Sequence, residues 1–173
     1  MRNVTVYNQE VYKILNRQKV FSKNALFIKG SAIAIEINLA AKIISNDNTS
    51  IMGWVFFVLA VVVAPIAFFV YPLSRAKKNY EKDKKINNGQ ELVNTIDFEK
   101  DKIVCHNNMH QTASVRYIDV QEIVLTNTLI ILKKDGKELI HLDRNGFINS
   151  TDEECLNLLE VKCTKLTRPF RKK

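Results

Sequence analysis

Hydrophobic residues are concentrated in two neighbouring segments in the first half of the chain. The second segment, Ile51–Leu73, carries no charge, and a helix of that length crosses a hydrocarbon core of about 30 Å. Its fourteen Ile, Leu, Val and Phe residues favour insertion by about 6 kcal/mol. Trp54 and Tyr71 lie near its ends, as aromatic residues do at headgroup depth, and Pro65 should bend the helix. The pattern predicts a transmembrane helix.

The first segment, Ala25–Ile44, is apolar but contains Lys29, Glu36 and Lys42. Its large apolar residues favour insertion by about 4 kcal/mol, whereas a carboxylate near the middle of the span costs about 3 kcal/mol. The two lysines lie near opposite ends, where their ammonium groups can reach the interface. We expect a transmembrane helical hairpin over residues 25–73, with spans 25–44 and 51–73 and an outer turn at Ser45–Ser50.

The polar residues of the first segment do not gather on one side of a helix. At 100° per residue, Lys29 and Glu36 share a face, whereas Ser31, Asn38 and Lys42 fall nearly opposite. A helix lying on the membrane surface would collect its polar residues on one face. The spacing therefore favours insertion over surface binding.

Positive charge flanks the two segments and is missing from the turn between them. The chain has a formal net charge of +8. A basic helical linker, residues 74–89, follows the second span. Its basic residues are predicted to contact anionic lipid headgroups and are Arg75, Lys77, Lys78, Lys82, Lys84 and Lys85. Because basic residues also precede the first span, the positive-inside rule predicts a multi-pass protein of the cell membrane with both termini cytoplasmic.

The second half of the chain has the signals of a small antiparallel β-sheet. Short runs rich in Val, Ile, Thr and aromatic residues are separated by turn residues; the runs are Glu91–Phe98, Ile103–His110, Ala113–Tyr117, Val120–Leu125, Leu129–Lys133 and Glu138–Leu142. Asp135-Gly136 predicts a tight hairpin. A capping box at Ser150–Glu153 predicts a C-terminal helix that packs on the sheet. The fold class is thus an α+β membrane protein, with an N-terminal segment (1–24), a β-domain with its helix (90–166) and a basic tail (167–173).

This order of parts resembles a known family. The segments that carry the resemblance are FEKDKIVCHNNM, VRYIDVQEIVLTNTLIILKKDGKELIHLDRNGF and a helix that begins STDEECLNLLE, after two hydrophobic segments. The chain is similar to the YcxB-like family of small bacterial membrane proteins, whose C-terminal domain is similar to pleckstrin-homology (PH) folds. The resemblance implies a PH-like β-domain. It implies no catalytic residues.

The sequence offers little evidence for chemistry at a metal or an active site. Cys105 and His106 point to opposite faces of a strand, and His110 and His141 complete no zinc spacing. No catalytic or nucleotide-binding motif is present, so we expect no enzyme, no cofactor and no metal. The charge clusters come without a nucleic-acid recognition motif, so no nucleic-acid partner is expected. Glu36 is the possible functional residue, because an intramembrane carboxylate is costly unless it is paired or protonated.

Three functions suit this organisation. The leading hypothesis is a membrane-anchored cytoplasmic interaction module that binds a protein, a peptide or anionic lipid headgroups through the PH-like domain. The alternative is an immunity or self-protection protein whose hairpin blocks a membrane-active peptide. The third is a transporter or channel component. Two spans are too few for a substrate path, so this function requires a homo-oligomer, with Glu36 in a ring.

Overall fold

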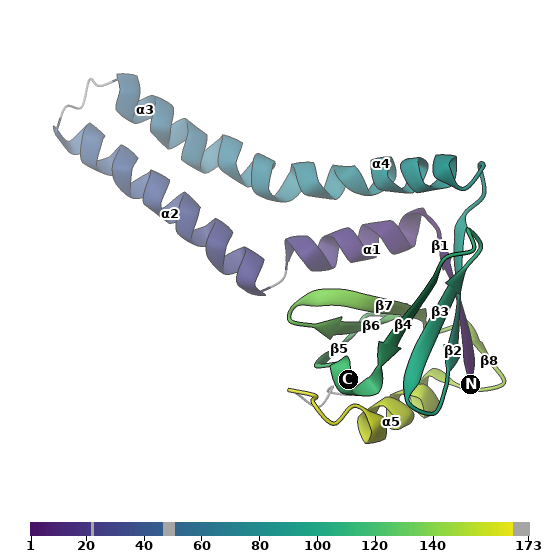
Figure 1. Ribbon diagram of the computed structural model, residues 1–173. Helices are drawn as coiled ribbons and strands as arrows, with labels where there is room; N and C mark the ends of the chain where they lie inside the picture. The colour runs from purple at the N-terminus through teal and green to yellow at the C-terminus, as the bar shows by residue number, and fades with distance from the viewer. Residues whose placement is uncertain (22, 47–50, 168–173) are drawn as a thin grey trace. The chain divides into compact units, whose positions relative to one another are not determined.

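The computed structural model describes residues 1–21, 23–46 and 51–167 and divides the chain into two compact units (Figure 1). Met1–Tyr7 and Lys84–Lys173 form one unit, called here the β unit. Asn8–Asp83 form the other, called here the helical unit. The predicted class, α+β with antiparallel sheets, is confirmed.

Two antiparallel sheets make up the β unit. The five-stranded sheet has the order β4-β3-β2-β1-β8, with β1 at Arg2–Tyr7, β2 at Leu92–Phe98, β3 at Lys102–Asn107, β4 at Thr112–Arg116 and β8 at Phe147–Ile148. The three-stranded sheet has the order β5-β6-β7, with β5 at Glu122–Leu125, β6 at Leu129–Lys134 and β7 at Lys137–Asp143. A 3-10 turn, η3 at Tyr117–Asp119, joins the two sheets. The sheet strands therefore come from both sides of the helical unit in the sequence.

Strand β1 was not predicted from the sequence. All six of its residues pair with β2, from Arg2 opposite Asp97 to Tyr7 opposite Leu92. Its pattern hides it, because the side chains that point inward include polar Asn3 and Thr5, whereas Val4 points outward. Its partner strand also lies far along the chain. The N-terminal segment thus begins as part of the sheet.

The predicted hairpin at Asp135-Gly136 is confirmed. These residues connect β6 to β7, and Lys134 pairs with Lys137. Both central residues have positive φ, 50° at Asp135 and 74° at Gly136, as a type I′ turn requires. Local sequence therefore determines this turn.

The C-terminal helix, α5 at Asp152–Lys162, is capped one residue later than predicted. The capping box uses Thr151, whose hydroxyl accepts from the Glu154 amide, and the Glu154 carboxylate accepts from the Thr151 amide. The prediction of Ser150 and Glu153 was therefore wrong. Both pairs have the same spacing, and the helix that begins at Asp152 packs Cys155, Leu156 and Leu159 into the core.

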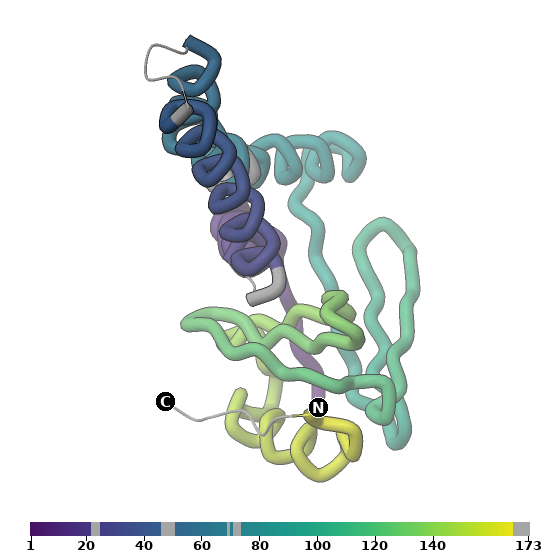
Figure 2. Tube along the Cα trace, turned by 90° about the vertical axis from the view of Figure 1, so that its left-hand side faces the viewer, coloured from purple at the N-terminus to yellow at the C-terminus, as the bar shows by residue number. Residues whose placement is uncertain are grey.

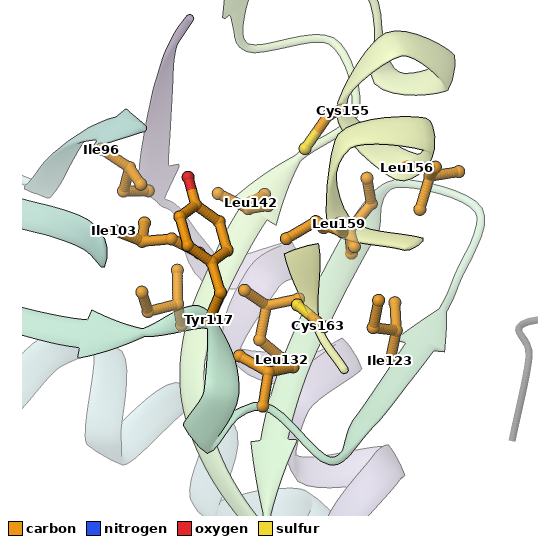
Figure 3. Packing of buried hydrophobic residues seen from close by; sticks show 13 residues of the cluster. Ile96, Ile103, Tyr117, Ile123, Leu132, Leu142, Cys155, Leu156, Leu159 and Cys163 are labelled. Carbon is orange, nitrogen blue, oxygen red and sulfur yellow. The ribbon is translucent and has the colours of Figure 1, made fainter. Parts of the chain in front are cut away.

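The hydrophobic core lies between the sheets and α5 (Figure 3). Cys155, Leu156 and Leu159 of α5, with Cys163 directly after the helix, meet the buried strand residues, and Ile96, Ile103, Leu132 and Leu142 are among the most buried of these. Each fully buried Leu or Ile stabilises the fold by about 1.5–3 kcal/mol. The β unit therefore has a core of its own.

The helical unit consists of a short helix followed by two longer helical segments that lie side by side. The elements are α1 (Gln9–Val20), α2 (Lys23–Asn46), α3 (Ile51–Val58), the π-helical turns η1 (Leu59–Val63) and η2 (Ile66–Val70), and α4 (Tyr71–Ile86), whose last three residues already belong to the β unit. α2 lies beside α3 in both views (Figures 1 and 2). Ala25–Ile44 is helical, within α2. Of the predicted outer turn, Ser45 belongs to α2 and residues 47–50 lie outside the described residues.

The helix from Ile51 onwards is continuous but irregular around Pro65. π-helical turns lie on both sides of this residue, and the helix changes direction between α3 and α4 (Figure 1). Proline removes a backbone donor, and π-turns accommodate the mismatch. The helix ends at Ile86, where the Gly89 amide donates to the Lys84 carbonyl and Gly89 has a φ of 82°.

Candidate functional site: the apolar helix pair and its basic flank

Small residues line the contact between α2 and the helix that follows it. Ala40 and Ala60 are fully buried, and Ala64 is nearly so. A Cβ atom added at Gly53 would lie 2.7 Å from Ile44 Cγ1 and 3.3 Å from the Ile44 amide nitrogen. Glycine therefore permits the close approach of the two helices at this point. Small residues at helix contacts are typical of pairs packed in a bilayer.

Lys29 of α2 faces the neighbouring helix and binds its backbone. Its ammonium group donates to the Phe68 carbonyl at 2.8 Å and to the Val20 carbonyl at 3.3 Å. In a regular α-helix, the Phe68 carbonyl would accept from the residue four positions on. That residue is Pro72, which has no N–H. Phe68 lies in the π-helical turn η2, and Lys29 adds a donor to a carbonyl that Pro72 cannot serve.

Glu36 lies on the same side of α2 as Lys29. Gly53 lies beside Ile44, and Phe68 lies beside Lys29. Glu36 is eight residues before Ile44 and seven after Lys29, and Val61 is eight residues after Gly53 and seven before Phe68, so Glu36 lies level with Val61 in η1. Its Oε2 atom is buried and has no hydrogen-bond partner among the residues that the structure describes. The carboxylate therefore points into the helix pair. Its functional role stays a prediction.

The outer surface of the helix pair is strongly apolar. Ile51, Phe27 and Ile28 are 80%, 77% and 67% exposed. Among the described helices, the stretch Ile51–Phe68 is long and apolar enough to cross a membrane, and only 17% of its residues are buried. A core helix of a soluble protein is mostly buried. The span predicted at Ala25–Ile44 is not such a stretch, so a second crossing stays a prediction.

The basic residues predicted to contact lipid do not all share one face of α4. Arg75, Lys78, Lys82 and Lys85 fall within an arc of about 80° on an exposed side of the helix. Lys77 and Lys84 lie on a different side.

These two lysines also differ from the other four in their contacts or burial. Lys77 is 3.7 Å from the Glu81 carboxylate, and Lys84 is half-buried. The four-residue arc, called here the Arg75 face, is the coherent part of the predicted site. The basic tail residues 168–173 lie outside the described residues.

The side of α4 nearer to the protein interior is fixed against α1. The Tyr12 hydroxyl donates to the Asp83 carboxylate at 2.5 Å, and the Tyr12 and Tyr80 rings meet edge to face. Ala76, one turn before Tyr80, is buried. This packing sets which side of α4 is covered, and the Arg75 face lies away from it.

A polar network that was not predicted from the sequence lies inside the β unit. The fully buried Asn3 amide donates to the Asp143 carbonyl at 2.7 Å. Thr5 donates to the side-chain oxygen of Asn3 at 2.8 Å and accepts from the Asp143 amide. Buried polar groups need such partners. The network ties β1 to β7.

At the end of β1 the network continues to His141. The Tyr7 hydroxyl lies 2.8 Å from His141 Nδ1, and His141 Nε2 lies 3.2 Å from the Glu138 carboxylate. The Asn94 amide donates to the Tyr7 oxygen at 3.2 Å. Burial raises the pKa of the Tyr7 hydroxyl, which therefore stays protonated at neutral pH. The arrangement positions β1 and exposes no reactive group.

The residues weighed for a metal site are kept apart. Cys105 is half-buried on the inner side of β3, whereas His106 is exposed and hydrogen-bonded to Thr112 at 2.9 Å. His110 occupies a turn with a φ of 60°. Within residues 1–21, 23–46 and 51–167, no three His, Cys, Asp or Glu residues gather as metal ligands would.

One sheet edge is open. In an antiparallel pair of strands, residue pairs joined by backbone hydrogen bonds alternate with pairs that are not. In the β3–β4 pair, Asn107 bonds to Gln111 at one end and Tyr117 bonds to Asp101 at the other. The alternation directs the backbone groups of Thr112, Ser114 and Arg116 away from β3.

No other described strand pairs with this edge of β4. The other edges are covered or short: β8 has two residues, Thr167 bonds to Gln121 beside β5, and Thr5 bonds to the backbone of β7. An open edge can accept an extended peptide.

Comparison of the chain with protein-family models, with curated proteins and with solved structures found no match in any of the three.

Proposed function

We propose that the chain is a membrane-anchored interaction module. In this proposal, α2 and α3 cross the bilayer as a hairpin, and the β unit lies on the cytoplasmic side, where it binds a partner. Two antiparallel sheets closed by a C-terminal helix agree with the PH-like layout that the YcxB-like resemblance implies. The helical unit is inserted between the first and second strands of that layout.

The pairing of β1 with β2 carries the proposal. β1 precedes the helical unit in the sequence and β2 follows it, yet all six residues of β1 pair with β2. A chain that starts and ends in one sheet must cross a membrane an even number of times between those points. If the apolar helix at Ile51–Phe68 crosses once, then a second segment must return. α2, with 24 residues, is the helix long enough to do so.

The placement of polar groups on α2 supports insertion despite its charges. Lys29 and Glu36 face the neighbouring helix instead of lipid. Ser31 and Asn38 donate to the carbonyls of Phe27 and Ala34, one turn earlier, at 2.9 and 2.8 Å. Such bonds reduce the cost of a polar side chain in hydrocarbon. The apolar gain and the polar cost of inserting Ala25–Ile44 are nearly equal, and these contacts lower the cost, which favours a membrane crossing by α2.

The Arg75 face supports contact with anionic lipid. It follows the apolar stretch directly, where the chain leaves the hydrocarbon core, and its four cations lie on one exposed side. Each basic residue near an anionic leaflet contributes about 1 kcal/mol of attraction. The Arg75 face thus favours the cytoplasmic leaflet and holds α4 close to it.

The open edge of β4 supports binding of a protein partner. An extended segment aligned with Thr112, Ser114 and Arg116 would satisfy their outward backbone groups. The exposed side chains at this edge are small or polar apart from Arg116, and the strand has no bulge or proline that would block pairing.

Extraction of membranes with alkaline carbonate tests the anchor. The full chain should stay in the membrane pellet. A variant with Val58→Lys and Val62→Lys, two exposed positions, opposes insertion by about 5–7 kcal/mol, which cancels the apolar gain of the span, and should be extracted. The matched Val58→Leu and Val62→Leu variant should stay. Extraction of the unaltered chain would contradict the proposal.

A further inference from the structure

The side of α2 that points away from α3 carries small and polar residues. Ser31, Asn38 and Ser45 recur every seven residues, and Ala34 and Ala41 lie between them with the same spacing. Asn38 is nine positions from Lys29, which faces the neighbouring helix, so it points to the opposite side. All five residues are exposed. We call this surface the Asn38 face.

The helix that begins at Ile51 has the kind of surface expected to face lipid. The exposed residues between Ile51 and Val63 are large and apolar, with Trp54 near the start. Between Ser31 and Ser45 the Asn38 face contains no such residue, although it belongs to the other half of the same helix pair; Phe27, seven residues before Ala34 on the same side, is large and 77% exposed. A difference of this kind indicates that another helix covers the Asn38 face in the bilayer.

The hydrogen bonds of the Asn38 face leave one group incomplete. The hydroxyls of Ser31 and Ser45 and one N–H of Asn38 are used within α2. The carbonyl oxygen and second N–H of the Asn38 amide have no partner among the described residues. In hydrocarbon an amide without partners costs several kcal/mol. A partner helix must therefore offer both a donor and an acceptor at this level.

We propose that the Asn38 face joins two copies of this chain, with Asn38 of each copy hydrogen-bonded to Asn38 of the other. This inference rests on the proposed insertion of α2. All copies insert in the same orientation, so two α2 helices that meet are parallel. In a parallel pair with seven-residue spacing, each core position meets its own counterpart.

An amide is complementary to itself, because each supplies the donor and the acceptor that the other needs. Ala34 and Ala41 allow the two backbones to approach closely. Lys42 lies beside the face near the end of α2, where its ammonium group can reach the headgroups. The Asn38 face thus has the shape and the hydrogen-bonding groups of a symmetric contact.

Disulfide cross-linking of the full chain in lipid nanodiscs tests the contact. Ala41→Cys should give a disulfide-linked dimer on mild oxidation. Ala67→Cys, at an exposed alanine in η2, is the matched control and should not. The unaltered chain controls for its native cysteines, which all lie in the β unit.

Energy transfer between labelled copies, measured at several lipid-to-protein ratios, gives the association constant. Asn38→Leu should lower it by about 5- to 30-fold. Ala34→Ile should also lower it, since the branched side chain prevents close approach. Ala67→Ile adds the same bulk on the other helix and should leave it unchanged.

The inference is overturned if the chain resists carbonate extraction but stays monomeric at every ratio, or if Asn38→Leu and Ala34→Ile associate as the unaltered chain does. It is also overturned if Ala41→Cys cross-links in cells only to a different protein. Carbonate extraction of the unaltered chain would instead contradict the proposed membrane anchor, so failure of the anchor and failure of the contact are distinguishable.

Discussion

The Lys29 ammonium group lies 2.8 Å from the Phe68 carbonyl oxygen and donates a hydrogen bond to it. A cation within an apolar helix is thereby used to satisfy a backbone group that Pro72, four residues later, cannot serve. A lysine of one helix thus gives the Phe68 carbonyl a donor that a proline of the other helix cannot supply.

Lys29→Met should lower the free energy of unfolding of the helix pair by about 1–3 kcal/mol, because it leaves the Phe68 carbonyl without this donor. Pro72→Ala restores an N–H at the required position, so the same Lys29→Met change should cost less in that background. Titration of the helical circular dichroism with sodium dodecyl sulfate in mixed micelles measures both costs. Equal costs in the two backgrounds would contradict the proposed compensation.

Gly53→Val should separate α2 from α3, because even a Cβ atom there lies 2.7 Å from Ile44 Cγ1. We expect a loss of about 1–3 kcal/mol from overpacking. Gly30 is the matched control, since nothing lies within 4 Å of a Cβ atom at that position. Gly30→Ala should be neutral or slightly stabilising because alanine favours the helix. The same detergent titration applies, and similar losses at both glycines would exclude close packing at Gly53.

Asp119 should give the β unit an acid-dependent contribution to stability. Hydrogen bonds from Arg116 and Lys134, both at 2.9 Å, lower the pKa of Asp119 to about 2. The unfolded pKa is about 3.9, so this contribution is complete above that pH and is lost as the pH falls towards 2. The stability difference between the unaltered chain and Asp119→Asn, measured by urea unfolding, should be constant from pH 7 to 5 and shrink below pH 4. A difference that persists at pH 2 would exclude this ion-pair cluster as its source.

Native thiols should react in a fixed order. Burial raises the pKa of Cys155 to about 12 and that of Cys163 to about 11. Both thiols are therefore protonated at neutral pH and shielded by the core, whereas Cys105 is only half-buried. Iodoacetamide at pH 7.5, followed by mass spectrometry, should modify Cys105 first and the other two only after denaturation. Rapid native modification of Cys155 would contradict the packing of α5.

Features set by nearby residues were predicted from the sequence. The hairpin at Asp135-Gly136 depends on two residues that accept positive φ, and the apolar stretch from Ile51 depends on composition alone. The end of α4 follows from Asn88 and Gly89 in the same way.

Features set by distant partners were not predicted. β1 becomes a strand because β2, more than eighty residues later, pairs with it, and its buried Asn3 and Thr5 resemble surface residues in the sequence. The cap of α5 lies at Thr151 and not at Ser150, although both residues are followed three positions later by a glutamate. Of the six basic residues predicted as one cluster, the geometry of α4 groups the four on the Arg75 face.

Accessibility of single cysteines in intact cells tests the hairpin most directly. The reporters are Asn48→Cys, between the two predicted spans, and Lys100→Cys, at an exposed turn of the β unit. A membrane-impermeant maleimide should label Asn48→Cys from outside and Lys100→Cys only after the cells are permeabilised. If both sites become accessible only after permeabilisation, or both are labelled from outside, then α2 and α3 do not carry the chain across the membrane and back, and the account is wrong.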